Sequence, residues 1–130
     1  MKFLKNLGLV LLLVLLLATG GFIAWSWAPD IPVAELKARW GQPPSQFIEV
    51  EGLQVHLRDE GPRNDPLPIV LLHGTAASLY TWDGWAAELR QERRVIRFDL
   101  PGFGLTGPNA ANDYSIAVYV RFVAALMDRL

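Results

Sequence analysis

The sequence predicts an α/β fold, with a mixed, mostly parallel sheet and flanking helices, preceded by one membrane-spanning helix. Three observations predict it. An uncharged apolar segment covers residues 7–27, a short two-strand pattern covers residues 47–57, and strands alternate with helices over residues 69–130. Strand–helix alternation at this spacing implies right-handed crossovers and parallel strands.

The N-terminal segment has the length and composition of a membrane-spanning helix. Residues 7–27 carry no charge, and these 21 residues form a helix of roughly 31 Å. The hydrocarbon core of a bilayer is about 30 Å thick, so the segment can span it. Lys2 and Lys5 precede it, and Trp25 and Trp27 lie near its far end. This distribution favours a cytoplasmic N-terminus and an extracytoplasmic location for the rest of the chain.

A cleaved signal peptide is the alternative interpretation of the same segment. Leu7–Leu17 would be its apolar region and Ala18-Thr19-Gly20 its small-residue cleavage site. The apolar character continues past that site through Phe22–Trp25, which favours an uncleaved anchor. The protein is secreted in the alternative case, and both interpretations place the remainder outside the cytoplasm.

The composition excludes several classes of function. Twelve basic and 13 acidic residues give a formal net charge of −1, without the basic stripe of a nucleic-acid-binding protein. There is no cysteine, and the only histidines are His56 and His73. We therefore expect neither a metal site nor a cofactor.

The chain divides into three predicted parts. Residues 1–28 form the anchor or signal, and residues 29–45 form a proline-containing linker with one short helical stretch, Val33–Trp40. Residues 46–130 form the domain, which opens with a predicted β-hairpin.

The second strand of this hairpin alternates apolar and polar residues. Leu53, Val55 and Leu57 alternate with Gln54, His56 and Arg58. This period of two is typical of a half-buried strand, so we expect His56 to be solvated.

The remaining elements follow in order. After a turn-rich loop over Asp59–Pro68, the apolar run Ile69–Leu72 predicts a strand that is buried on both faces. A helix is predicted from Thr81 to Arg90, with Trp82 and Trp85 as packing residues.

A second strand–helix unit follows. It consists of a strand over Arg94–Leu100, a loop over Pro101–Asn112, and a helix over Ser115–Leu130 that Asp113 or Ser115 can cap. The predicted apolar face of this helix consists of Ile116, Tyr119, Val120, Val123, Met127 and Leu130. Ser78 and Ser115 are interpreted as loop or cap residues rather than nucleophiles.

Two motifs follow the two predicted parallel strands. His73-Gly74-Thr75 comes directly after the first, and Asp99-Leu100-Pro101-Gly102-Phe103-Gly104-Leu105-Thr106 comes directly after the second. In this order and spacing, residues 46–130 resemble the front portion of an α/β-hydrolase.

The resemblance implies roles for these loops. The backbone N–H of Thr75 is the implied oxyanion-hole donor, and His73 and Gly74 shape that loop. His73 is interpreted as satisfying its ring nitrogens within the loop rather than transferring protons. The loop containing Asp99, Gly102 and Gly104 would border the pocket. In it we expect Asp99 to bind loop amides.

The expected nucleophile is missing from the sequence. The family serine lies in a G-x-S-x-G turn, and the acid and the base follow it; no such motif occurs in these 130 residues. We therefore expect a longer protein whose nucleophile lies beyond residue 130, and an inactive 130-residue stretch. Alone, this stretch would expose the edge of the Val95–Phe98 strand and would not form a stable soluble monomer.

The resemblance implies a hydrolase that acts on ester-type small-molecule or lipid substrates. Thr75, in place of the proline common in epoxide hydrolases and dehalogenases, favours a serine esterase over these aspartate-dependent classes. A non-catalytic, membrane-tethered module on a degenerate hydrolase fold is the other alternative. Residues 102–107 also match G-x-G-x-x-G. Pro108 follows, however, where a dinucleotide site needs a helix to begin.

Overall fold

The computed structural model describes residues 2–130, so Met1, the first residue of the predicted anchor, lies outside the described residues. The chain divides into two compact units, and the boundary along the sequence lies between Ile31 and Pro32. The predicted boundaries after residues 28 and 45 stay predictions.

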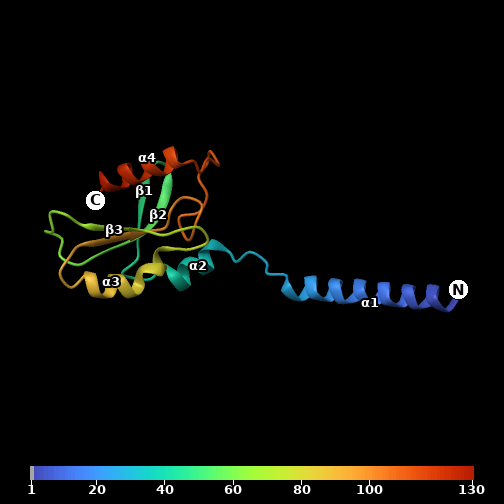
Figure 1. The fold of residues 1–130 in the computed structure, drawn as a ribbon. Helices are drawn as coiled ribbons and strands as arrows, with labels where there is room; N and C mark the ends of the chain where they lie inside the picture. The colour runs from blue at the N-terminus through green and yellow to red at the C-terminus, as the bar shows by residue number, and fades with distance from the viewer. Residues whose placement is uncertain (1) are drawn as a thin grey trace. The chain divides into compact units, whose positions relative to one another are not determined.

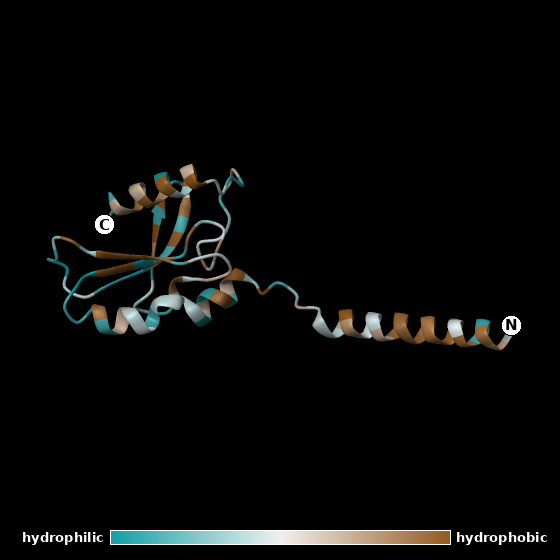
Figure 2. Cartoon of the chain, viewed as in Figure 1, coloured by the Kyte–Doolittle hydropathy of each residue, from teal (hydrophilic) through white to brown (hydrophobic). Residues whose placement is uncertain are grey.

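The first unit contains a single apolar helix. Helix α1 covers Lys2–Ser26, and the most apolar 18-residue stretch within Phe3–Ser26 has a mean hydropathy of 2.7 and is not buried inside the protein. Most residues along this helix are hydrophobic (Figure 2). These properties allow a membrane span, and a signal sequence has them as well.

The second unit is built on a four-stranded sheet with the order β1-β2-β4-β3. Its strands are β1 (Gln46–Val50), β2 (Leu53–Glu60), β3 (Ile69–Leu72) and β4 (Val95–Phe98). The β1–β2 and β2–β4 pairs are antiparallel, and the β3–β4 pair is parallel. The predicted mixed sheet, with the hairpin along one side, is confirmed.

Two details of the strand prediction are wrong. Strand β2 continues to Glu60, into the predicted turn-rich loop, because Asp59 and Glu60 pair with Ile96 and Val95 of β4. Strand β3, rather than β4, lies at the open side of the sheet, because β4 inserts between β2 and β3. Leu72 is consequently 45% exposed, so β3 is not buried on both faces in the described part of the chain.

Helices cover both faces of this sheet (Figure 1). On one face lies α4 (Ile116–Met127), and on the other lie the short 3₁₀ helix η1 (Leu79–Trp82) and α3 (Asp83–Leu89). The predicted Thr81–Arg90 helix thus begins as a 3₁₀ turn. The predicted stretch Val33–Trp40 is confirmed as helix α2.

The two faces of the sheet differ in character. The face under α4 carries the apolar core, which consists of Val50, Val55, Leu57, Ile96, Phe98, Phe122 and Leu126. The opposite face of β2 and β4 carries His56, Arg58, Glu60 and Arg97, because successive residues of a strand point to opposite sides.

The predicted apolar face of α4 is confirmed in part, because Val123, Met127 and Leu130 pack against the core. Phe122 and Leu126 are buried, whereas Ile116 and Val120 are 79% and 64% exposed. In α3, Trp85 is 66% exposed, so its predicted packing role is wrong. Ala86 is the buried residue of that helix.

Candidate functional site

The loops that follow β3 and β4 are joined through the ring of His73. The backbone N–H of Leu100 donates to His73 Nε2 at 3.0 Å, and His73 Nδ1 lies 2.8 Å from the carbonyl oxygen of Gly74. Since an amide can only donate, Nε2 is the unprotonated nitrogen and Nδ1 carries the proton. The buried ring also packs edge-on against Phe103 at 5.4 Å between ring centroids. Both nitrogens of His73 are therefore occupied in holding the two loops together.

The loop after His73 is exposed and conformationally constrained. Gly74 and Thr75 are exposed, and Ala76 adopts a left-handed conformation with φ of 55°. Such a conformation is uncommon for a residue with a Cβ, and it is found where loops are held for function. Within residues 2–130, the Thr75 N–H donates to no protein acceptor. Its role in an oxyanion hole stays a prediction.

Asp99 joins the other ends of the same loops. Its fully buried carboxylate accepts from the Leu79 N–H through Oδ1 and from the Leu105 N–H through Oδ2, both at 2.8 Å. Leu79 begins η1, directly after the His73–Ser78 loop, and Leu105 belongs to the glycine-containing loop. One carboxylate therefore fixes the positions of both loops relative to the end of β4.

Two of the three glycines of this loop, Gly102 and Gly104, are required by space as well as by backbone conformation. Gly104 has φ of 51°, and a Cβ there would collide with the carboxylate of Asp99. Gly102 has φ of 89°, and a Cβ there would lie 2.7 Å from the ring of Tyr114. The predicted pocket-loop residues Asp99 and Gly104 thus meet in the structure, and Gly102 faces a different neighbour.

His56 is completely buried, so the prediction that it is solvated is wrong. Its Nδ1 lies 2.7 Å from Asp99 Oδ2, and its Nε2 lies 2.9 Å from Ser45 Oγ. The ring stacks on Phe47 with centroids 5.0 Å apart. The burial of His56 could not be predicted, because alternation of polar and apolar residues does not distinguish a solvated strand face from one covered by other polar groups.

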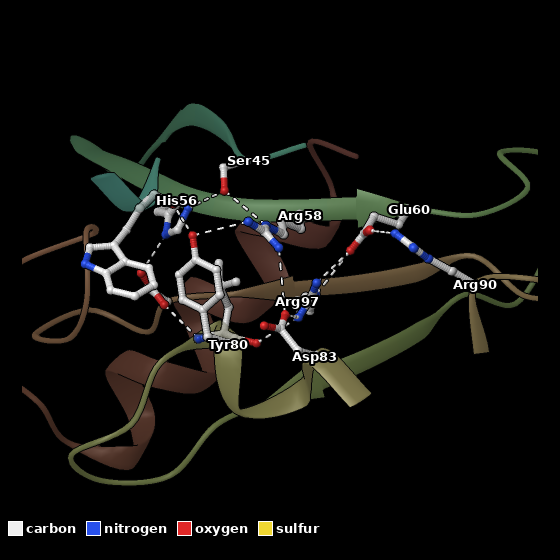
Figure 3. A network of polar contacts seen from close by, with 11 residues as sticks. Ser45, His56, Arg58, Glu60, Tyr80, Asp83, Arg90 and Arg97 are labelled. Atoms are coloured by element: carbon white, nitrogen blue, oxygen red, sulfur yellow. Dashed lines mark hydrogen bonds and ion pairs between the residues drawn. The ribbon is translucent and has the colours of Figure 1, made fainter. Parts of the chain in front are cut away.

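A layer of paired charges extends from His56 along this covered face (Figure 3). The buried Arg97 guanidinium donates to Glu60 Oε2 at 2.9 Å and to Asp83 Oδ1 at 2.5 Å. It also donates to the carbonyl oxygen of Leu79 at 3.2 Å. Leu79 is thus held through its N–H by Asp99 and through its carbonyl by Arg97. A buried charge needs such complete pairing, because removing one partner leaves the other desolvated and alone.

A mostly apolar pocket of about 300 Å³ opens between α2 and these loops. It is lined by Leu36, Trp40, Ser78, Tyr80, Asp99, Gly104 and Leu105. Its volume is at the lower end of the range for small-molecule sites. Across residues 2–130, no three histidine, aspartate or glutamate side chains are grouped so that they could hold a metal ion.

The structure is therefore an α/β fold with a mixed sheet. The loops that follow β3 and β4 are held in place by the buried side chains of His73 and Asp99. Residues 68–130 match the family model described as alpha/beta hydrolase fold. This part of the chain belongs to the α/β-hydrolase superfamily.

Characterised relatives and solved structures are similar to this chain. The 2-hydroxy-6-oxo-2,4-heptadienoate hydrolase of Pseudomonas putida is 34% identical over 88 residues, which cover 65% of this chain and 31% of the relative. The haloalkane dehalogenase of Psychrobacter cryohalolentis is 39% identical over 80 residues, which cover 60% and 26%. The crystal structure of a bacterial membrane phospholipase A, described as a virulence factor, has a TM-score of 0.62 and 25% identity, covering 92% of this chain and 39% of that one. The chain spans about a third or less of the length of the curated relatives it matches.

Proposed function

We propose that the protein is a hydrolase acting on an ester-type bond of a small-molecule or lipid substrate. One observation carries this proposal: His73 and Asp99 lock together the loops after β3 and β4, and the amide of Thr75 is left without a protein acceptor among the described residues. A fixed N–H of this kind stabilises the negative charge that develops on a substrate oxygen. The nucleophile, acid and base belong, in this proposal, to a part of the protein beyond residue 130.

The oxyanion role of the Thr75 amide can be tested with a single substitution that removes its N–H hydrogen. In the full-length protein we expect Thr75→Pro, which removes the N–H, to lower kcat for ester hydrolysis by about 10²–10³-fold. Thr75→Ala keeps the amide and is the matched control, and it should retain most of the activity. Equal losses in the two variants, with native circular dichroism spectra, would reject the oxyanion role.

Three observations support a lipid substrate over a soluble one. The pocket beside the loops is lined mainly by aliphatic and aromatic side chains, and the chain carries an apolar helix long enough to span a bilayer. The similarity to a membrane phospholipase A also covers most of this chain. Kinetics on phosphatidylcholine vesicles and on a short-chain soluble ester would decide between the two classes. A preference for the soluble ester would count against the lipid.

The proposed location is a single-pass membrane protein with a cytoplasmic N-terminus and an extracytoplasmic hydrolase part. Lys2 and Lys5 before the apolar helix support this orientation. Mass spectrometry of the mature protein should find the uncleaved N-terminus in a carbonate-resistant membrane fraction. A mature chain that begins near Phe22 and is found in the soluble fraction would instead establish secretion.

A further inference from the structure

The side chains of Ser45, His56 and Asp99 form a continuous hydrogen-bonded relay. Ser45 Oγ lies 2.9 Å from His56 Nε2, and His56 Nδ1 lies 2.7 Å from Asp99 Oδ2. Figure 3 shows Ser45 directed at the imidazole of His56. The three residues come from separate places: Ser45 directly precedes β1, His56 lies within β2, and Asp99 follows β4.

The hydrogen bonds define where the protons of this relay lie. Both oxygens of Asp99 already accept from backbone amides, those of Leu79 and Leu105, which is the pattern of a carboxylate. A carboxylate requires a proton on His56 Nδ1, and in the neutral imidazole this leaves the lone pair of Nε2 facing the hydroxyl of Ser45. This is the arrangement in which a buried aspartate orients a histidine as general base for a serine.

The surroundings hold the base rigid and leave the serine accessible. His56 is fully buried and stacks on Phe47, while the Ser45 backbone N–H donates to the Gln42 carbonyl at 3.0 Å. Ser45 itself is only partly buried. Ser45 is therefore the more exposed end of the relay, while its base stays protected from water.

A positive charge lies beside the same hydroxyl. Arg58 Nε donates to Ser45 Oγ at 3.1 Å, and the Arg58 side chain is 16% exposed. Its guanidinium also approaches the ring of Tyr80, at 4.7 Å from the centroid. Because the hydrogen bond from Arg58 occupies a lone pair of Oγ, the hydroxyl hydrogen of Ser45 stays free to donate to His56 Nε2.

From this geometry we propose that Ser45 is an activated nucleophile that accepts an acyl group from small esters. It is a second reactive serine, separate from the nucleophile expected beyond residue 130, and it goes beyond the proposed function. In the first step Ser45 Oγ bonds to the carbonyl carbon and its proton passes to His56 Nε2. The ester C–O bond then breaks, and the leaving alcohol takes that proton. Water releases the acid by the reverse proton path, which restores the hydroxyl.

The test measures covalent labelling at this one side chain. The purified protein containing residues 1–130, in detergent, is treated with a small fluorophosphonate, and tandem mass spectrometry follows the adduct on each serine-containing peptide. We expect Ser45 to react about 10²-fold faster than Ser78, which is also partly buried but has no histidine partner, since general-base assistance supplies at least that factor. Peptide mapping separates this labelling from that of any serine outside residues 1–130, so this proposal and the proposed function can fail independently.

Two controls connect the reactivity to the relay. In urea the fold is lost, and Ser45 should then react no faster than Ser78. His56→Gln, checked for native circular dichroism, should slow the labelling of Ser45 to the rate of Ser78. Native protein in which Ser45 and Ser78 react equally slowly would overturn the proposal. Rapid labelling of Ser45 that persists in urea would overturn it as well.

Discussion

At the scale of single residues, the contact between Gly104 and Asp99 predicts a difference in the free energy of unfolding between two glycine-to-alanine variants. A Cβ at Gly104 would collide with the Asp99 carboxylate, whereas a Cβ at Gly107 would meet no atom within 4 Å. Both glycines have positive φ, so alanine costs about 1–2 kcal/mol at either position. We expect Gly104→Ala to lower the free energy of unfolding by about 1–3 kcal/mol more than Gly107→Ala, because of the added overlap. Urea titrations of the two variants compare them directly, and equal losses would show that the carboxylate moves aside freely.

Asp65 gives a residue-scale prediction about pH. Its side chain is 8% exposed, and its carboxylate accepts from Arg93 Nε at 2.8 Å and from the backbone N–H of Arg94 at 2.9 Å. The hydrogen bond from Arg93, with those from the Leu67 and Arg94 amides, lowers the pKa of Asp65 to about 2. A lowered pKa stabilises the fold above the unfolded-state value near 3.8, and this stabilisation is lost as pH falls towards 2.

Replacing this carboxylate should flatten the acid dependence of stability. We expect Asp65→Asn to have a lower free energy of unfolding than the wild type at pH 6. Between pH 4 and pH 2, this free energy should fall less in the variant than in the wild type. Chemical unfolding at each pH measures both effects. Identical slopes in the two proteins over that range would contradict the assignment.

The sequence identified the residues that hold the loops after β3 and β4, but it did not predict which residues they contact. Asp99 and Gly104 were identified from the motif, but their mutual contact was not. His56 was expected to be solvated, because its partners Ser45 and Asp99 lie 11 and 43 residues away. Local alternation contains no information about what covers a strand face.

At the scale of elements, helix α4 provides a matched pair of substitutions. Phe122 is buried against Phe98 of the sheet with ring centroids 6.1 Å apart, and Val120 is 64% exposed on the same helix. We expect Phe122→Ala to cost about 3–5 kcal/mol through the cavity it leaves. Val120→Ala should change the free energy of unfolding by less than about 0.5 kcal/mol. Thermal unfolding of both variants checks this, and a large loss in the Val120 variant would mean that another surface covers it.

The face of α4 was predicted only in part, because apolar residues lie on more than one side of the helix. Ile116 and Val120 share the 3.6-residue period with each other, and Phe122 and Leu126 share it along a different stripe. Periodicity alone could not choose between the stripes. The choice is made by contact with the core of the sheet, which includes Phe98 and Ile96.

At the scale of the whole molecule, the open side of the sheet at β3 predicts self-association. Leu72 is 45% exposed there, and an unpaired strand edge is a template for pairing with another chain. We expect residues 32–130, produced alone, to elute as oligomers in size-exclusion chromatography. Leu72→Lys should shift them towards the monomer. Leu67→Lys is the control, because Leu67 is 74% exposed but lies outside the strand. An equal effect of both lysines would indicate a general effect of charge rather than edge pairing.

The strand order is the part of the fold that the sequence did not predict. Alternation of strands and helices correctly predicted the parallel β3–β4 pair and the early hairpin. The antiparallel pairing of β2 with β4 joins Leu57 to Phe98, and no local pattern records a pairing over that separation. The open edge was therefore assigned to the wrong strand.

This strand order also has a consequence for biosynthesis. Strand β3 is complete at Leu72, but β4, which joins it to the hairpin, is complete only at Phe98, 26 residues later. At typical elongation rates of about 5–20 residues per second, the nascent chain holds β2 and β3 without their shared neighbour for roughly one to five seconds. The interval between the emergence of β3 and that of β4 from the ribosome thus sets how long these edges stay unpaired and available to chaperones. Slower codons translated in that interval would favour aggregation of the emerging chain without altering a single amino acid.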